Sequence, residues 1–334
     1  MASPNYYRGR FAPSPTGPLH FGSLAAAIGS YLDARHHNGT WLVRMEDIDT
    51  PRCVPGAADG ILRTLEAFGL HWDGEIIYQS QRTGAYEEAL QRLHEICAAY
   101  PCACTRKEIS DSALHGIEGP VYPGTCRNGV PAGREGRAWR VRTGAPFLSP
   151  CMGKVRMGVG QWVNEASTPS LTLPLQGGGN IEFDDVLQGH LIQHLETEIG
   201  DFVVKRADGL FAYQLAVVVD DVFQGITHVV RGADLLHSTP RQIYLQRLLG
   251  LATLAYMHLP IAVNAHGEKL SKQTLAPAIV TDDVVVTLVA VLEFLRQQPP
   301  AELRQGRVEE VLGWAVENWH PERMKGCRQL PAPI

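Results

Sequence analysis

The first hundred residues alternate between short apolar stretches and longer segments whose apolar side chains have helical spacing. Strands are predicted at residues 7–12, 40–46 and 75–80, and helices at residues 24–34, 57–68 and 86–99. This alternation is typical of a parallel sheet with helices on its faces. Ligands of such sheets bind beyond the carboxyl ends of the strands. Residues 10–14 and 46–49 follow or end predicted strands, so they mark a candidate site.

The pattern changes after residue 101. Residues 102–137 are rich in turn formers and contain three cysteines. Residues 145–180 contain six glycines, four prolines and only three charged side chains, which predicts a long surface insertion or a disordered loop. We assign no function to this insertion.

Strand-like and helical segments resume after residue 181. The apolar segments 202–205, 211–221 and 227–232 could re-enter the sheet as strands. Residues 239–249 have helical spacing, residues 263–274 form a polar loop, and residues 282–319 contain two further helical patterns. The predicted fold class is therefore α/β.

Composition narrows the class of protein. The 334 residues are 45% hydrophobic and 19% charged, which is typical of a globular enzyme with a substantial core. Neither a membrane span nor a signal core is visible, so we expect a cytoplasmic protein. A formal net charge of −5 argues against a surface coated with basic charge for nucleic acid, although it allows a local basic groove. Seven cysteines without an export signal argue against a disulfide framework.

The stretch PSPTGPLHFGSL, residues 13–24, joins the first predicted strand to the first predicted helix. The start of a helix offers free N–H groups and a positive dipole end, which suit phosphate. Gly22 would let a bulky ligand approach the backbone, and His20 lies beside it. The alternative is an ordinary strand–turn–helix connection with an incidental histidine.

A second polar stretch, KLSKQ at residues 269–273, places Lys269 and Lys272 on a loop. Lysine side chains on a loop can follow and neutralise a moving polyphosphate. Taken alone, two lysines at this spacing are more typical of a solvated loop than of a phosphate site. Together with His20 it predicts a two-part phosphate clamp.

These motifs resemble those of class I aminoacyl-tRNA synthetases. PSPTGPLHFGSL is similar to their HIGH region and KLSKQ to their KMSKS loop, while RFAPSPTGPLH, RMEDIDTPR and HVVRGADLL resemble the glutamyl branch. The resemblance spans residues 8–272 apart from the insertion. Ser23 stands in place of the second histidine of HIGH, and Gln273 replaces the last serine of KMSKS.

The resemblance implies a Rossmann-like catalytic domain that activates an amino acid with ATP. Its carboxylate attacks the α-phosphorus and pyrophosphate leaves, so catalysis is mostly positioning and charge stabilisation. His20 would hydrogen-bond phosphate oxygens, Gly22 would lie against ATP, and Lys272 with Lys269 would stabilise the leaving pyrophosphate. Mg²⁺ is expected to accompany ATP, held mainly by the phosphates.

The glutamyl branch implies a site for two carboxylates and one ammonium group. Arg10 and Arg231 are the expected carboxylate clamps, because a guanidinium pairs with a carboxylate through two parallel hydrogen bonds. Glu46 is the expected ammonium partner, unless it forms a purely structural salt bridge with Arg231. The positions that match the glutamate site are Arg10, Phe11, Ala12, Pro13, Ser14, Glu46, Tyr213 and Arg231.

The cysteines Cys102, Cys104 and Cys126 lie in the turn-rich segment and suit zinc, which needs a fourth ligand. His115 is the conventional choice. The resemblance instead implies the oxygen of Tyr122, which we favour, and three unrelated thiols are the remaining alternative. The other cysteines lack such spacing and are expected to be inert: Cys53, Cys97, Cys151 and Cys327.

Only 62 residues follow Lys272, so we expect no separate anticodon-reading domain. A shortened branch, the glutamyl-queuosine tRNA(Asp) synthetases, fits this length. The resemblance implies tRNA-independent activation of glutamate, then transfer to queuosine at the wobble position of tRNA(Asp), whose anticodon stem-loop would enter the catalytic groove. The alternatives are a minimal enzyme that charges the 3′ end of tRNA(Glu) and a non-catalytic tRNA-binding paralogue.

Four regions are predicted from these patterns. Residues 1–101 form the first half of the catalytic domain, and residues 102–137 form a zinc module. Residues 138–280 contain the insertion and the rest of the catalytic domain, and residues 281–334 form a helical C-terminal part. We expect glutamate, ATP and tRNA as partners, and neither DNA nor a membrane.

Overall fold

The N-terminal strands form the parallel sheet that the hydrophobic pattern predicts. The structure is a computed structural model, and it describes residues 6–111, 115–117, 119–144, 179–270, 277–279 and 281–333. β1 (Arg8–Phe11), β2 (Thr40–Met45) and β3 (Ile77–Tyr78) lie in the order β1-β2-β3, all parallel. Their carboxyl ends therefore meet at one edge of the sheet.

The crossovers between these strands are helical, as expected. α1 (Phe21–His36) begins three residues before the predicted start, because His20 caps it. α2 (Ala57–Ala67) buries Ile61 and Leu65 on one face. α3 (Thr83–Glu95) ends earlier than predicted, since Cys97 has a positive φ of 57° and the strand β4 (Ala99–Cys102) follows.

A second set of strands continues the architecture. β8 (Asn180–Asp185), β9 (Gly189–His194), β11 (His228–Gly232) and β12 (Ala255–Leu259) lie in the order β11-β12-β8-β9, parallel except for the β8–β9 hairpin. The backbone N–H of Thr227 donates to the carbonyl of Arg8 at 2.9 Å, which joins the start of β11 to β1. The carboxyl ends of β1, β2, β11 and β12 thus open toward one region.

Two of the three segments expected to re-enter this sheet do otherwise. β10 (Phe202–Lys205) belongs to an antiparallel sheet with β4 and β7 (Ala138–Val141). Residues 211–221 are mostly helical, in α6 (Tyr213–Phe223). This apolar run is buried on nearly every side, so its period could not separate a buried strand from a buried helix. Only 227–232 enters the parallel sheet, as β11.

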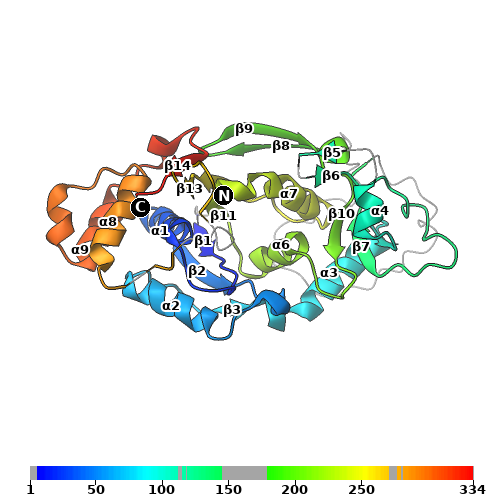
Figure 1. Cartoon of the computed structure of the whole chain (residues 1–334), viewed down its shortest axis with the longest axis horizontal. Coiled ribbons are helices and arrows are strands. Elements are labelled where there is room, and N and C mark those ends of the chain that lie inside the picture. The colour runs from blue at the N-terminus through cyan, green and yellow to red at the C-terminus, as the bar shows by residue number, and fades with distance from the viewer. Residues whose placement is uncertain are drawn as a thin grey trace, which may run out of the picture.

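The remaining elements complete the layers around the sheets. α7 (Thr239–Leu248), α8 (Val284–Phe294) and α9 (Val308–Glu317) match the predicted helical patterns. Figure 1 shows α8 and α9 at one end of the long axis and α4 (Arg106–Ser110) at the other. The short elements are η1 (Thr50–Arg52), η2 (Gln79–Gln81), β5 (His115–Gly116), β6 (Gly119–Pro120), α5 (Leu195–Glu198), η4 (Ala233–Ser238), β13 (Ile261–Val263), η6 (Ala301–Gln305), η7 (Pro321–Met324) and β14 (Gln329–Pro331).

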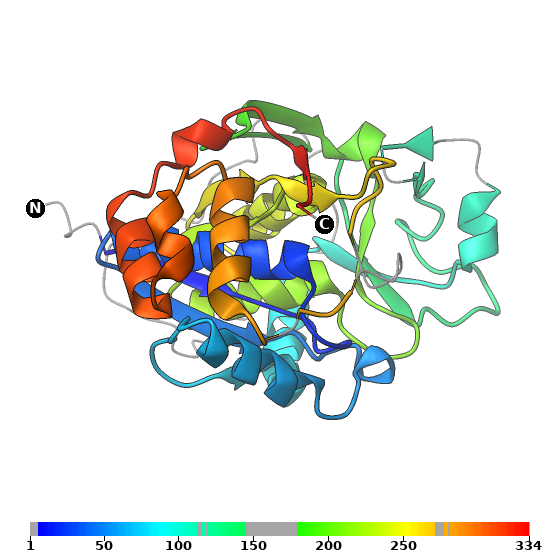
Figure 2. The same ribbon diagram turned by 60° about the vertical axis from the view of Figure 1, so that its left-hand side comes forward.

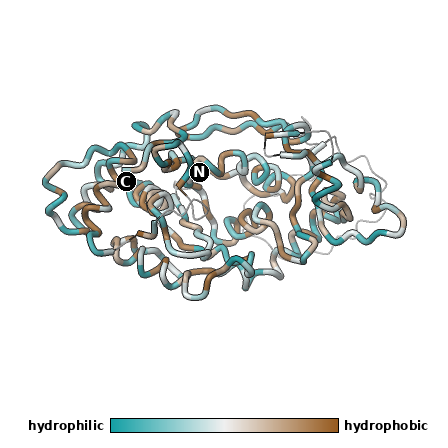
Figure 3. Tube along the Cα trace, viewed as in Figure 1, coloured by the Kyte–Doolittle hydropathy of each residue, from teal (hydrophilic) through white to brown (hydrophobic). Residues whose placement is uncertain are grey.

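Buried apolar side chains of the described residues form three clusters. The first lies between the β1–β3 sheet and α1, α8 and α9, and the second packs α3, α6 and α7 against β10 and β11. In Figure 2 α8 crosses in front of α1, and in Figure 3 the hydrophobic colour concentrates on inward-facing helix surfaces. The third cluster is small: Tyr100, Cys102, Tyr122 and Cys126. No described helix has the length and apolarity needed to cross a bilayer.

Some of the predicted segments lie outside the described residues, so the structure cannot be compared with them. Residues 145–178 of the predicted insertion lie outside the described residues, as do Lys272 and Gln273 of the lysine loop. The fold does not test the predicted domain boundaries, so these remain predictions.

Candidate active site

The start of α1 provides an anion-binding environment. The Nδ1 atom of His20 accepts a hydrogen bond from the backbone N–H of Ser23 at 3.2 Å, and Nε2 lies 2.9 Å from the Ser23 hydroxyl. No acidic residue occupies the first turn of α1, so its positive dipole end is not neutralised there. His20 therefore caps the helix. To contact a phosphate, its Nε2 atom would have to give up the Ser23 hydroxyl and bind a phosphate oxygen in its place.

The segments on both sides of the lysine loop lie beside this helix start. Ala278 forms an antiparallel bridge with His20, and Leu270 donates its N–H to Ala262 of β13. The Nζ atom of Lys269 lies 2.6 Å from a carboxylate oxygen of Asp234. A Cβ at Gly22 would meet the His20 ring at 3.4 Å, an ordinary contact, so packing within the chain does not itself require glycine there.

A buried ion network occupies the strand ends behind the helix start. Asp221 of α6 accepts from Arg10 through Nε at 3.2 Å and Nη2 at 3.4 Å, and from Arg44 at 2.7 Å. Arg44 also reaches Glu46 at 3.4 Å and the side-chain oxygen of Gln224 at 2.8 Å. The Nη1–Nη2 edge of Arg10 is left for a further carboxylate, because its Nε–Nη2 edge binds Asp221.

The two carboxyl groups of this network have opposite pKa shifts. Burial favours the protonated form of Asp221, but Arg10 and Arg44 outweigh it, so the pKa of Asp221 lies below its usual value. Burial raises the pKa of Glu46 above its usual value, and Arg44 and Arg10 only partly offset that effect. Glu46 therefore shares Arg44 with Asp221 and is only partly neutralised by it, and a substrate ammonium group would supply a further cation.

Arg231 of β11 is held by neutral groups. It donates through Nε to His258 at 3.2 Å and through Nη1 to the Tyr213 hydroxyl at 3.2 Å. Its Nη2 donates to Thr239 and to Gln242, each at 2.8 Å. Its side chain is almost fully buried, and no acidic side chain is among these partners. A buried guanidinium with neutral partners is suited to an incoming carboxylate.

Tyr213, the first residue of α6, connects the two arginines. Burial raises the pKa of its hydroxyl, and the charges of Arg231, Glu46, Arg10 and Asp221 all act on it. The candidate glutamate residues from β1, β2, α6 and β11 thus converge on one region. Two cations and one partly neutralised acid at that place complement a molecule with two carboxylates and an ammonium group.

The loop after β1 contributes mainly backbone. Phe11 and Pro13 are buried, Ala12 is half-buried and Ser14 is exposed. The backbone carbonyl of Pro13 accepts from the N–H of Glu46 at 2.9 Å, which ties the ends of β1 and β2 together.

An open pocket with an empty volume of about 540 Å³ begins at Asp47, the residue that follows Glu46 in the chain. Asp47 is part of its wall and accepts from the Ser80 hydroxyl at 2.6 Å. The lining residues are Pro15, Asp47, Thr50, Cys53, Val54, Gly56, Ala58, Asp59, Tyr78 and Ser80. The pocket is formed by the segments that follow β1, β2 and β3, at the ligand-binding edge of the sheet.

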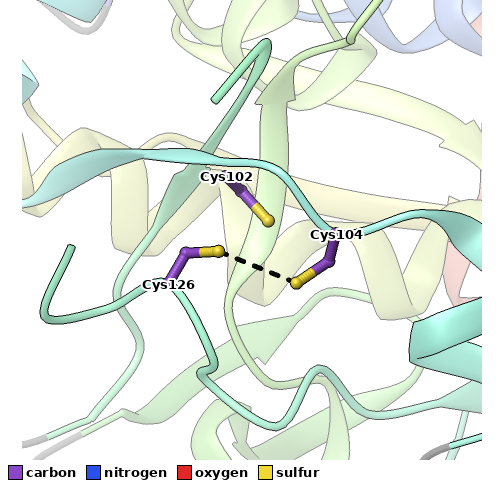
Figure 4. A group of neighbouring side chains, drawn as sticks. All are labelled: Cys102, Cys104 and Cys126. Carbon is purple, nitrogen blue, oxygen red and sulfur yellow. Dashed lines mark hydrogen bonds between the residues drawn. The ribbon is translucent and has the colours of Figure 1, made fainter. Parts of the chain in front are cut away.

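A cysteine cluster lies in the small third core. The Sγ atoms of Cys102, Cys104 and Cys126 lie within 4.8 Å of one another, and Figure 4 shows their side chains pointing toward a common space. The Cys104 and Cys126 sulfurs are 3.7 Å apart. Tetrahedral zinc with bonds of about 2.3 Å to sulfur would separate two sulfurs by about 3.8 Å. The geometry therefore fits a zinc ion.

Tyr122 completes this arrangement. Its hydroxyl lies 3.3 Å from the Cys102 sulfur and 3.6 Å from the Cys104 sulfur, near the value of about 3.5 Å expected for oxygen and sulfur ligands on one zinc. The N–H of Cys126 donates to the same oxygen at 2.9 Å. His115 lies on β5 and does not join the metal-binding group found among the described residues.

Comparisons with known proteins agree with this geometry. The family model described as "tRNA synthetases class I (E and Q), catalytic domain" matches residues 7–129 and 163–296. A glutamyl-Q tRNA(Asp) synthetase of Dechloromonas aromatica is 58% identical over 96% of this chain and 95% of its own length. One from Chromobacterium violaceum is 54% identical over 97% of this chain and 98% of its own. The chain belongs to the glutamyl-Q tRNA(Asp) synthetase family.

A solved structure supports the fold of this family member. The glutamate–tRNA synthetase of Elizabethkingia anophelis aligns with a TM-score of 0.71 at 21% identity, covering 98% of this chain and 68% of that one. The α/β class I synthetase fold predicted from the motifs is thereby confirmed.

The structure adds residues to which the sequence analysis gave no role, although one of them, Arg44, is the first residue of the motif RMEDIDTPR. Arg44 and Asp221 hold Arg10 and Glu46, while His258 holds Arg231. The sequence did contain signals for these residues, because charged side chains are rarely buried without a partner. Asp221 is one of two adjacent acids in an apolar run, and Arg44 lies in the buried strand β2. The alternative of a Glu46–Arg231 salt bridge is wrong for the described structure, where Glu46 pairs with Arg44 and Arg231 with neutral groups.

Proposed function

We propose that this chain activates glutamate with ATP without tRNA, and then transfers the glutamyl group to queuosine at the wobble position of tRNA(Asp). The observation that carries the proposal is the convergence of Arg10, Arg231 and Glu46 around Tyr213, at the start of α6. Membership of the family supports it, since relatives over nearly full length carry the name glutamyl-Q tRNA(Asp) synthetase.

The charges suggest how glutamate is held. Arg10 offers its Nη1–Nη2 edge to one carboxylate, and Arg231 offers Nη1, beside the Tyr213 hydroxyl, to the other. Glu46 takes the ammonium group, whose charge offsets the desolvation of its carboxylate. Phe11, Ala12, Pro13 and Ser14 form the adjoining wall.

Activation then needs little covalent chemistry from the protein. The glutamate carboxylate oxygen forms a bond to the α-phosphorus of ATP as the bond to the pyrophosphate oxygen breaks. His20, Gly22 and the start of α1 bind the phosphates, and Lys272 and Lys269 stabilise the charge that develops on the leaving pyrophosphate. Mg²⁺ arrives with ATP, whose phosphates hold it.

The cysteine cluster is proposed to hold one structural zinc. Cys102, Cys104, Cys126 and Tyr122 would fill all four positions, leaving none for substrate, which is the arrangement of a structural site. Burial acts to raise the pKa of the Cys126 thiol, but hydrogen bonds from the Ala103 backbone and from the neighbouring side chains outweigh burial and lower that pKa. A lowered pKa favours the thiolate that a metal requires.

The acceptor is proposed to enter through the open pocket lined by Asp47, the residue after Glu46. Segments from three strand ends line it. We propose the four predicted regions as the organisation of the chain, with residues 102–137 as the zinc module. The cytoplasm is the proposed location, because ATP and tRNA are its substrates.

The activation step is tested by ATP–pyrophosphate exchange with glutamate in the absence of tRNA. Exchange is expected with glutamate and not with glutamine, because a neutral amide leaves a buried guanidinium incompletely paired. Equal exchange with both amino acids would contradict the assignment of Arg10 and Arg231.

The acceptor step is tested with radiolabelled glutamate and four altered forms of tRNA(Asp). tRNA that lacks queuosine should remain uncharged, and an isolated anticodon stem-loop that carries queuosine should be charged. Removal of the 3′-terminal adenosine should leave charging intact, while periodate, which cleaves vicinal diols, should abolish it. Loss of charging together with the terminal adenosine would replace this proposal by a minimal enzyme for tRNA(Glu).

A further inference from the structure

We propose that Asp185 and His258 are positioning residues that fix Arg231 for glutamate. This inference rests on the proposed role of Arg231 as a glutamate clamp. The three side chains come from neighbouring parallel strands, β8, β12 and β11, and Arg231 is the Cα partner of His258 in the sheet register. Together they form a line of hydrogen bonds across the sheet.

The hydrogen bonds determine where the proton of His258 lies. Its Nδ1 atom is 2.6 Å from a carboxylate oxygen of Asp185, and both side chains have no exposed surface. Its Nε2 atom accepts from the Nε–H of Arg231 at 3.2 Å and also lies 3.0 Å from the Thr239 hydroxyl. An ionised Asp185 needs a proton on Nδ1, and Arg231 needs Nε2 without one, so both neighbours select the same neutral tautomer.

The pKa shifts support this protonation state. Burial lowers the pKa of His258 below its usual value, although the hydrogen bond to Asp185 works in the opposite direction. Burial favours the protonated form of Asp185, but the hydrogen bond with the His258 side chain and those from the backbone of Gln188 and His258 favour the carboxylate, and the pKa of Asp185 is lowered. A neutral histidine therefore lies between a carboxylate and a guanidinium.

This arrangement leaves one side of Arg231 for substrate. Nε is directed to His258, and both hydrogens of Nη2 are used by Thr239 and Gln242. Nη1 donates to the Tyr213 hydroxyl, and its second hydrogen has no partner among the described residues. If His258 carried its proton on Nε2, that proton would face the Nε–H of Arg231. It could turn only toward the Thr239 hydroxyl, which already accepts from Nη2 of Arg231, so the guanidinium would lose its hydrogen bond to His258 and shift from this position.

Asp185 allows the tautomer to be changed with almost no change in shape. Its Oδ1 atom accepts from the backbone N–H groups of Leu187 at 3.0 Å, Gln188 at 2.9 Å and His258 at 3.3 Å. In an Asp185→Asn variant these three donors would hold the amide oxygen at the Oδ1 position. The amide NH₂ would then face Nδ1 of His258 and force the proton onto Nε2.

The experiment measures ATP–pyrophosphate exchange at pH 8 as a function of glutamate and, separately, of ATP. Asp185→Asn should raise the KM for glutamate by about 10- to 100-fold, the range typical of partners that fix a histidine tautomer at a metal site. Its KM for ATP should stay within about twofold. Asp184→Asn is the matched control, because Asp184 is adjacent, exposed and paired only with His190 on the same hairpin; it should leave both KM values unchanged.

A second substitution separates positioning from damage to the fold. His258→Gln provides an amide oxygen that can accept from Arg231 and has no tautomer to change. Added to Asp185→Asn, it should lower the glutamate KM by about tenfold relative to the single variant, although it removes a further hydrogen bond. A purely structural role for Asp185 would make the double variant worse than the single one.

The outcomes distinguish this inference from the function on which it rests. Absence of glutamate-dependent exchange in the unmodified protein overturns the proposed function. Normal exchange together with an unchanged glutamate KM in Asp185→Asn overturns the positioning role alone. Equal increases in the KM values for glutamate and ATP, or no recovery in the double variant, also overturn it.

Discussion

The glutamate region and the cysteine cluster place their polar side chains in opposite ways. In the glutamate region, Arg10, Arg44 and Asp221 lie in separate elements, and buried ion pairs between them fix their positions. In the cysteine cluster the candidate ligands lie within 25 residues of sequence, and the apolar core around them is small. The surrounding fold orders the first region. The order of the second region depends on the group that its thiols bind.

The difference concerns the source of the stabilising free energy. A large core can support buried charges, provided each finds a partner. A core of four buried side chains cannot order a turn-rich segment by apolar burial alone, and a structural metal commonly supplies what is missing. The loss of stability caused by a substitution should therefore extend through the fold when the residue lies in the first region, and should remain local when it lies in the second.

The largest effect is expected from Arg44→Met. The substitution leaves Asp221 and Glu46 buried with one fewer cation, and breaking a buried pair typically lowers the free energy of unfolding by about 3–5 kcal/mol. Arg52→Met is the matched control, because its pair with Asp49 is largely exposed and is expected to contribute no more than about 1 kcal/mol. Urea unfolding of both variants measures the contrast, and equal losses would show that the buried network does not support the fold.

A smaller effect, mainly on catalysis, is expected at the helix start. His20→Ala and Lys272→Ala should each lower ATP–pyrophosphate exchange by about 100-fold, as loss of a charge-stabilising group does. His20→Asn is the informative control, because asparagine is a good helix cap but lacks the imidazole. If His20→Asn retained full exchange, capping would be the whole role of His20.

The cysteine cluster should respond locally. Elemental analysis should find about one zinc per chain in protein purified without added metal. Cys126→Ser should lose that metal and increase amide hydrogen exchange in β4 and β7, while α1 remains protected. Cys53→Ser, at a cysteine outside the cluster, should change neither measurement. Loss of protection throughout the chain would contradict the distinction between the two regions.

The smallest effect is a dependence on pH. The pKa of Glu46 is raised, so this group loses its charge earlier than an ordinary glutamate as the pH falls. The KM for glutamate should therefore rise as the pH falls through that raised pKa. Glu46→Gln should have a high KM that changes little over the same range. Asp221 has a lowered pKa, so the stability it contributes is present above the unfolded-state pKa and is lost only as the pH falls toward the folded value.

Local patterns were sufficient for elements with a clear period or a clear terminus. The strands β1 and β2, the helix α2 and the strand–helix order of the first hundred residues followed from hydrophobic spacing. The run that contains α6 was assigned wrongly, because burial on all sides removes the periodic signal. The end of α3 was missed, because Cys97 gives no sequence signal for a positive φ.

The sequence by itself determined the family, the residue types of the glutamate site and the spacing of the candidate zinc ligands, because each of these is written in short contiguous motifs. Only the tertiary structure decided that Glu46 pairs with Arg44 and that Asp185 and His258 lie behind Arg231. These contacts join residues from different strands and helices. Their energies depend on burial and on which donor faces which acceptor, and neither quantity exists until the sheet has formed.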